Sequence, residues 1–157
     1  MAEPRDLLED YVAAGRVMQL ATLDRAGAPA VCNLWQASAF QPDRFYFISR
    51  PQREHCANIR ADGRVSGAIL SVAPTDYGDP VRGVSFTGRA RELPTTGIDG
   101  HIQVYVGKWP KAARALDPRR LANGEAHHRV YLIEVAGWVL FDEVNFRGEP
   151  RQVIDAR

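Results

Sequence analysis

Four polar residues that follow an aromatic run are the ones best suited to do chemistry in this sequence. They are Ser49, Arg50, Arg53 and His55. The run 45–48 before them has strand character, and the residues up to Ile59 are expected to form one or two helical turns. Free backbone N–H groups at a helix start, together with cationic side chains, bind phosphate with little rearrangement. The stretch therefore predicts an anion site where a strand ends and a helix begins.

A plainer interpretation of the same residues stays open. Arg50 and Arg53 are close together in a short loop, and neighbouring charges of this kind commonly form a solvated face. His55 also fits an exposed helix position, and its imidazole is a weaker phosphate partner than lysine because it is only partly charged near neutral pH. The residues by themselves do not decide between phosphate binding and solvent exposure.

The composition is that of an ordinary globular protein and places the function in a local site. The chain has 157 residues, 45% apolar and 25% charged, which predicts a single domain over residues 1–157. Twenty basic and nineteen acidic residues leave a net charge of +1, so the charge does not favour non-specific binding to nucleic acid or to an anionic membrane. No apolar run approaches the roughly 20 residues that a membrane span requires.

Cysteine and histidine usage predicts a cytoplasmic protein without a metal site. Cys32 and Cys56 are the only cysteines, and their spacing matches no metal or redox motif. No signal peptide precedes them, which favours the cytoplasm. His127 and His128 are adjacent, with Glu125 nearby, and two adjacent histidines cannot easily share one metal geometry.

The hydrophobic pattern predicts a mainly β fold. Strands are expected at 17–23, 30–38, 45–48, 65–70, 82–92 and 130–141, and the tail 144–154 is a candidate for one more short strand. Helices are expected at 4–15, 95–106 and 110–116, with a polar connection at 117–128. Strands joined mostly by short turns and interrupted by few helices are typical of an antiparallel barrel with helices packed outside it.

Two positions within these elements predict local features of the backbone. Gly67, in the fourth predicted strand, indicates either a bulge or a place where a flat ligand or another subunit approaches the backbone. Pro110 cannot continue the preceding helix and is expected to hold Trp109 at an exposed corner.

The order of several short motifs resembles a known family. The chain is similar to the FMN-binding split barrels related to pyridoxamine phosphate oxidase, and the resemblance spans residues 17–142. It is carried by Leu20–Leu23, the turn 24–27, the aromatic strand ending at Ser49, His55, Asn58-Ile59, Arg64-Val65, the strand 83–91 and the corner Lys108-Trp109-Pro110. Because His55 stands where the family usually has lysine, the chain looks closest to the small YhbP-like bacterial branch.

The resemblance implies a fold, a cofactor and an assembly. The fold would be a six-stranded antiparallel Greek-key split barrel, and the protein a homodimer with FMN at the subunit interface. Ser49, with Ile48 beside it, matches the position that contacts the flavin phosphate or ribityl chain, and His55 matches the phosphate-binding lysine. The implied cofactor-binding residues, with Arg53 from the anion site, are Asn33, Leu34, Trp35, Ile48, Ser49, Arg53 and His55.

For each of the two tryptophans of the site, a packing role is the alternative to ligand binding. Trp35 matches the strand that passes along the isoalloxazine ring, but a strand tryptophan more often packs in the core. Trp109 is a candidate for the substrate side of the flavin, with packing or a subunit contact as the alternative. Neither alternative is decided by the sequence.

The differences from the oxidase argue against the oxidase's own reaction but leave flavin binding as the expectation. Cys32 and Ala37 stand where the oxidase has arginine and lysine, Glu54 replaces another arginine, and the C-terminus lacks the oxidase's arginine and histidine pattern. We therefore predict an FMN-dependent oxidoreductase that acts on a small molecule of unknown identity, with no catalytic acid or base assigned. The alternatives are a deazaflavin-dependent reductase and a non-enzymatic flavin- or haem-binding protein.

Overall fold

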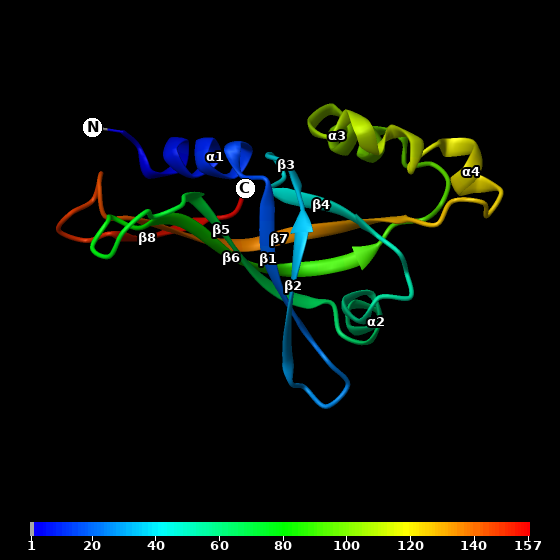
Figure 1. The fold of residues 1–157 in the computed structure, drawn as a ribbon, viewed down its shortest axis with the longest axis horizontal. Coiled ribbons are helices and arrows are strands. Elements are labelled where there is room, and N and C mark those ends of the chain that lie inside the picture. The colour runs from blue at the N-terminus through cyan, green and yellow to red at the C-terminus, as the bar shows by residue number, and fades with distance from the viewer. Residues whose placement is uncertain (1) are drawn as a thin grey trace.

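A curled antiparallel sheet forms the centre of the computed structural model, which describes residues 2–157 (Figure 1). Its strands are β1 (Val17–Leu23), β2 (Pro29–Trp35), β3 (Ala37–Ala39), β4 (Arg44–Ser49), β5 (Arg64–Val72), β6 (Arg82–Glu92), β7 (Arg129–Asp142) and β8 (Arg151–Asp155). Their order across the sheet is β2-β1-β5-β6-β7-β4-β3, and β8 pairs with β7. The prediction of a mainly β, antiparallel barrel with flanking helices is confirmed.

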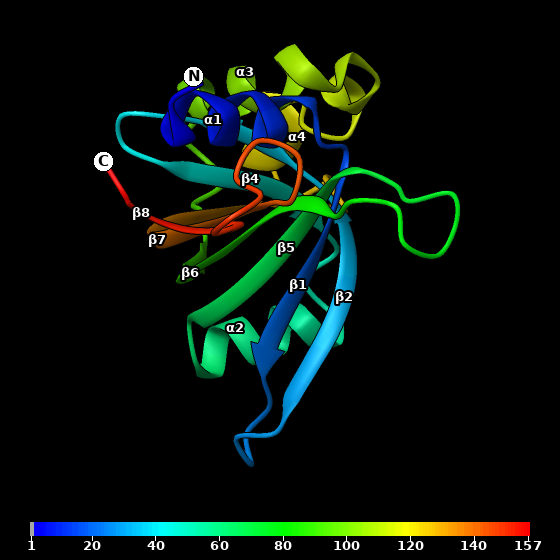
Figure 2. The same ribbon diagram turned by 90° about the vertical axis from the view of Figure 1, so that its left-hand side faces the viewer.

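Helices cover the sheet from two sides. They are α1 (Pro4–Ala14), α2 (Glu54–Ala61), α3 (Asp99–Lys108), the 3-10 helix η1 (Pro110–Arg114) and α4 (Pro118–Ala122). In both views α1 and α3 lie on one side of the sheet and α2 on the other (Figures 1 and 2). Leu8 and Val12 of α1 are fully buried, as the helical spacing of its apolar residues predicts. Within residues 2–157, no helix combines the length and the apolar character that crossing a membrane would require.

The predicted count of six strands is wrong, because the sheet has eight. The expected strand 30–38 is interrupted at Gln36, which is fully buried. Its side-chain amide donates to the carbonyls of Val12 and Gly15, and its backbone N–H donates to the carbonyl of Arg16. The backbone bond continues the β1–β2 register by one residue, and the strand assignment is interrupted at Gln36 between β2 and β3. The additional strand in the tail is confirmed as β8.

The expected polar connection 117–128 contains a helix, α4, that the hydrophobic pattern did not predict. Asp117 caps it by accepting a hydrogen bond from the Arg119 N–H at 2.9 Å, and Pro118 occupies the first turn. Leu121 is the residue of this helix that is buried. A single buried residue produces no periodic signal, so only the Asp-Pro pair marks α4 in the sequence.

Two neighbouring strands of the same chain approach the backbone of Gly67 closely. A Cβ at this position would lie 2.5 Å from the ring of Phe86 and 2.9 Å from the carbonyl oxygen of Gln19. The close approach expected from the sequence therefore comes from β6 and β1, and neither a ligand nor a second subunit is needed to explain the glycine.

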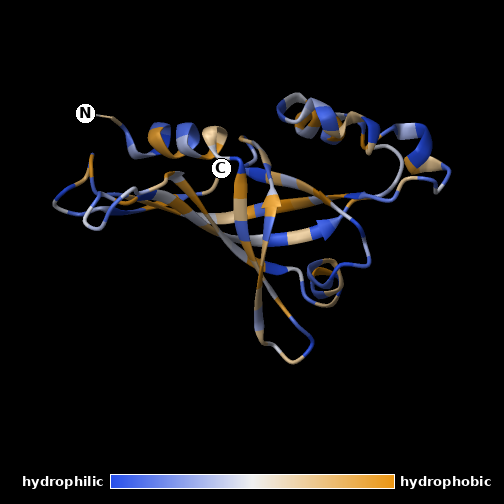
Figure 3. Ribbon diagram, in the orientation of Figure 1, coloured by the Kyte–Doolittle hydropathy of each residue, from blue (hydrophilic) through white to orange (hydrophobic). Residues whose placement is uncertain are grey.

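Two hydrophobic clusters form the core. The larger one includes residues of α1, α2 and the concave side of the sheet, among them Phe45, Phe86 and Trp138. The smaller one joins α3 and α4 to β4 and β7. Figure 3 shows many apolar residues along the strands, and apolar residues alternating with polar ones along α1. The smaller cluster fixes the helices that border the groove described below.

A buried ion pair connects the N-terminal helix to the sheet. The Arg5 guanidinium donates to both carboxylate oxygens of Asp43, at 2.8 and 2.6 Å. The same carboxylate accepts from the Trp138 indole N–H at 2.7 Å and the backbone N–H of Arg157 at 3.1 Å. Burial raises the pKa of Asp43, but these donors outweigh it and hold the pKa below its ordinary value.

We expect Asp43→Asn to lower the free energy of unfolding by about 3 kcal/mol at neutral pH, because it leaves Arg5 buried without its main partner. A depressed carboxyl pKa stabilises the fold above the unfolded-state pKa, and this stabilisation is lost as the pH falls through the folded-state pKa. The wild-type protein should therefore lose more stability on acidification than the variant. Urea unfolding at neutral and acidic pH measures both effects.

Glu9→Gln provides the control for this experiment. Glu9 accepts from the same arginine at 2.6 Å, but its side chain is partly exposed. Its loss should cost less than about 1 kcal/mol. Equal losses from the two substitutions would contradict the role assigned to Asp43.

Candidate functional site

An apolar groove with a volume of about 770 Å³ lies between the end of β2 and the segment from α3 to η1. The sheet side of the groove is formed by Asn33, Leu34, Trp35 and Ile48. The other side is formed by Tyr105, Trp109, Pro110, Lys111, Ala112 and His128. Its size and its aromatic walls are typical of a site for a small organic molecule, since such sites span roughly 300–1,000 Å³.

Side chains of α3 attach this helix to the backbone at the end of β2. The Tyr105 hydroxyl donates to the carbonyl of Trp35 at 3.2 Å, and the Trp109 indole N–H donates to the carbonyl of Gln36 at 2.9 Å. Lys108 donates to the carbonyls of Ala13 and Gly15, and burial lowers the pKa of this amine to about 8. The corner Lys108-Trp109-Pro110 thus holds one wall of the groove against the sheet.

Trp35 is not a core residue. Its side chain is 56% exposed, and its ring meets the edge of the Trp109 ring with centroids 4.9 Å apart and planes at 73°. The core position that is commoner for a strand tryptophan is therefore wrong here. Trp109 is half-buried and lines the groove. Both rings can contact a molecule bound in the groove, and an edge-to-face pair holds them in place.

A polar corner lies where β4 ends and α2 begins. We use this name for Ser49, Arg53 and His55. The hydroxyl of Ser49 and Nε2 of His55 are hydrogen-bonded at 2.8 Å, with Ser49 buried and His55 half-buried. Arg53 is exposed at the N-cap of α2, and no acidic residue of the described chain forms an ion pair with it. The free backbone N–H groups at the start of α2 add further donors.

The environment of His55 favours its neutral form. Burial is the largest cause of its lowered pKa, the positive charge of Arg53 lowers it further, and the negative charge of Glu54 partly offsets both. An anion bound at the corner would act in the opposite direction and favour the imidazolium.

The structure divides the predicted cofactor-binding residues into two groups. Asn33, Leu34, Trp35 and Ile48 lie together in the groove, and Trp109, directly after the end of α3, lines the same groove. The polar corner does not line the groove. The two groups meet on β4, where Ile48 of the groove is followed directly by Ser49 of the corner.

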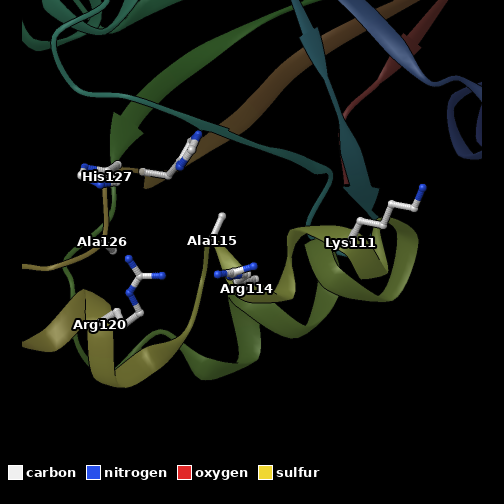
Figure 4. A pocket seen from close by; sticks show the side chains of 7 residues that line it. Lys111, Arg114, Ala115, Arg120, Ala126 and His127 are labelled. Atoms are coloured by element: carbon white, nitrogen blue, oxygen red, sulfur yellow. The ribbon is translucent and has the colours of Figure 1, made fainter.

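Several residues of the site were missed from the sequence. Tyr105, Lys111 and His128 line the groove. Tyr105 and Trp109 are four residues apart, and this helical spacing, which places two side chains on one face, is the signal in the sequence that pointed to Tyr105. Lys111 and His128 also line a second, smaller pocket beside the groove (Figure 4). We call it the cationic pocket, and its polar residues are Lys111, Arg114, Arg120, His127 and His128. Across residues 2–157, no group of three or more His, Cys, Asp and Glu side chains is arranged to hold a metal ion.

Comparison with protein families explains the architecture. The family described as pyridoxamine 5'-phosphate oxidase matches residues 5–140. The match confirms the resemblance and the split-barrel type of fold. No curated protein sequence matches the chain.

Solved structures share the fold at low sequence identity. A FAD-binding protein from Mesorhizobium loti is 24% identical, with a TM-score of 0.64 and a match that covers 84% of this chain and 89% of that one. A haem-binding protein from Mycobacterium smegmatis is 18% identical with a TM-score of 0.75, over 99% of this chain but 59% of that longer one. An F420 reductase is 17% identical with a TM-score of 0.55, over 83% of this chain and 94% of that one. These likenesses concern the fold alone.

We expect two neutralising substitutions next to His55 to shift its pKa in opposite directions. Arg53→Gln removes a repelling positive charge and should raise the pKa, whereas Glu54→Gln removes an attracting negative charge and should lower it. The imidazole proton resonances in an NMR titration measure the pKa in each variant. Shifts of the same sign in both variants would contradict the described environment of His55.

Proposed function

Because the chain belongs to the pyridoxamine 5'-phosphate oxidase-like family, we propose that it binds FMN and is an FMN-dependent oxidoreductase acting on a small molecule. The observation that carries the proposal is the joining of the groove and the polar corner through β4. Ile48 and Ser49 are consecutive residues of this strand, one lining the apolar groove and the other hydrogen-bonded to His55.

The residues present fit a flavin mononucleotide. The groove offers a flat apolar space beside Leu34, Trp35 and Trp109 for the ring system. Ser49, Arg53 and His55 offer a hydroxyl, a guanidinium and an imidazole for a phosphate, and charge-assisted hydrogen bonds of this kind are the strong ones. When bound, FMN supplies the hydride or electron transfer.

The protein's own residues bind and orient rather than move protons. Tyr105 donates its hydroxyl to the Trp35 carbonyl, and burial raises its pKa to about 12, so it stays protonated at neutral pH. The pKa of His128 is lowered by burial and by the charges of Arg50 and His127, which keeps this groove residue largely neutral. We assign no catalytic acid or base.

A homodimer would complete the site in this proposal. β2 is an edge strand, and it exposes Val31 by 69% and Trp35 by 56%. Large apolar side chains on an unpaired edge are typical of a surface that a partner covers. Trp35 belongs to both this edge and the groove, so a second copy docked here would help to enclose the cofactor.

A haem is the second candidate ligand, and His128 is the observation that favours it. His128 would be the residue to hold the iron of a haem, because histidine is a common haem ligand and His128 lines the groove with a lowered pKa that favours the neutral imidazole. The haem-binding relative has the same fold. A deazaflavin would use the flat part of the groove as FMN does. The visible spectrum of the purified protein separates haem from FMN, because a haem shows a single sharp Soret band and FMN shows two flavin bands.

Ser49→Ala combined with Arg53→Ala should weaken FMN binding at least about tenfold, because two charge-assisted or polar contacts to the phosphate are lost. Quenching of FMN fluorescence on titration with protein measures the affinity. Arg25→Ala is the control, since Arg25 lies in the turn between β1 and β2 and outside the groove. Unchanged affinity in the double variant would place the phosphate elsewhere, and a protein that never binds FMN would refute the proposal.

FMN affinity should rise as the pH is lowered from about 8 to about 6.5, because the charged form of His55 is the better phosphate partner and its pKa in the free protein is low. Phosphate binding then raises this pKa, so proton uptake accompanies binding. His55→Lys keeps its charge over this range and should bind more tightly at the higher pH, with a flatter dependence. The same slope in both proteins would show that His55 does not contact the phosphate.

A further inference from the structure

Three side-chain hydrogen bonds in a row attach the α3 segment to the sheet. His101 and Tyr105 are four residues apart on this helix, and Trp109 directly follows its end after four more. Tyr105 and Trp109 donate to backbone carbonyls at the end of β2 and directly after it. His101 makes the third bond, because its Nδ1 lies 2.6 Å from the hydroxyl of Tyr46 on β4. Histidine is the one side chain of this row that changes its charge between about pH 5 and about pH 8.

The surroundings of the Tyr46 hydroxyl require a neutral His101. Tyr46 is fully buried, and Nε of Arg44 donates to its oxygen at 2.9 Å. A guanidinium can only donate, so the single hydroxyl hydrogen of Tyr46 is directed to His101. His101 therefore accepts at Nδ1, and its imidazole carries its hydrogen on Nε2.

Protonation of His101 would break this hydrogen bond. Nδ1 would become a donor, and the hydroxyl hydrogen of Tyr46 would be buried without an acceptor, which costs free energy. The imidazolium would also lie close to the guanidinium of Arg44, and like charges repel. His101 is in the first turn of α3, where the helix dipole disfavours a positive charge. Since the attached helix requires the neutral imidazole, protonation favours its detachment.

The charged groups of the neighbouring elements do not reverse this effect. β3 has no titratable residue, β4 contributes Arg44, and η1 and α4 carry only basic residues. Asp99, the acidic residue of α3, is exposed, so solvent screens its attraction for an imidazolium. Glu134 of β7 is opposite Arg44 in the sheet, but it is exposed and forms an ion pair with Arg91 at 3.6 Å.

We infer that His101 is a positioning residue, whose neutral side chain holds α3, and with it Tyr105 and Trp109, against the sheet. Protonation loosens this wall of the groove and lowers the affinity of the groove for a flat apolar ligand. The inference rests on the proposed function, because that ligand is the flavin ring. His101 acts on the ring and His55 on the phosphate, so the two histidines respond to acid in opposite directions.

Riboflavin is the probe, because it has the flavin ring without the phosphate that His55 would contact. Its affinity for the wild-type protein, measured by fluorescence titration, should fall about fivefold from about pH 7.5 to about pH 5.5, which is the effect of losing one hydrogen bond. His101→Gln keeps an acceptor for Tyr46 and cannot become charged. Its riboflavin affinity should be the same at both pH values.

The indole N–H of Trp109 reports on the wall without any ligand. Its NMR signal, identified with Trp109→Phe, should move over the same pH range in the wild type and stay in place in His101→Gln. The indole signal of Trp138, which is bonded to the buried Asp43, is the internal reference. Tyr46→Phe removes the bond from the sheet side, so it should bind riboflavin at both pH values as weakly as the acidified wild type does.

His127→Gln provides the matched control. His127 is an exposed histidine of the connection after α4, and it does not line the groove. Its loss should leave the pH dependence of riboflavin affinity and of the Trp109 signal as in the wild type. Thermal unfolding checks that each variant folds, and the wild-type titration tests the inference without any variant.

Two results would overturn the inference. One is a pH dependence in His101→Gln that equals that of the wild type. The other is a wild-type Trp109 signal that does not change between the two pH values. If riboflavin binds at neither pH, but the Trp109 signal moves in the wild type and not in His101→Gln, the positioning role stands and the proposed function fails.

Discussion

The break in the sheet at Gln36 is the constraint on which the candidate site depends. The side-chain N–H groups of the buried Gln36 donate to carbonyls at the C-terminal end of α1, whereas its side-chain oxygen is buried without a hydrogen-bond partner. Its backbone carbonyl, released from the ladder, accepts the Trp109 indole N–H, and the preceding carbonyl of Trp35 accepts the Tyr105 hydroxyl. Hydrogen bonds at this interruption therefore connect the end of α1, the backbone after β2 and the end of α3.

Satisfied and unsatisfied charges lie in different parts of the molecule. Asp43 is buried, and each of its oxygens accepts hydrogen bonds from Arg5, Trp138 or the backbone of Arg157, so it contributes to stability and has no capacity left for a ligand. Around the groove, Arg53 at the polar corner and Arg114 and Arg120 in the cationic pocket have no acidic partners. These charges remain available to an anion, whereas Asp43 is committed to the fold.

The apolar groove lies between these two basic regions, so the site has an apolar middle and basic ends. A ligand that is flat and apolar in its middle and anionic at its ends matches both the aromatic walls and the charges. In the proposed function, the flavin ring would lie against the aromatic walls and its phosphate at the polar corner.

Local patterns in the sequence were sufficient for the elements and for the polar corner. The aromatic run before Ser49 predicted β4, the spacing of Leu8 and Val12 predicted the buried face of α1, and the change from strand to helix placed Ser49 near His55. These features depend on residues a few positions apart, for which strand and helix periodicities are reliable guides. The order of motifs was also sufficient for the family.

Tertiary structure alone decided which distant residues share a site. Gln36 looked like the middle of a strand, and its partners on α1 lie more than twenty positions away. Arg120 and His127 lie in a connection that looked merely polar, and the Tyr105 hydroxyl of α3 reaches a carbonyl of β2 that is seventy positions away in the sequence. The physical reason is that burial and hydrogen-bond satisfaction are settled by the whole fold, whereas periodicity and capping are settled within a few residues.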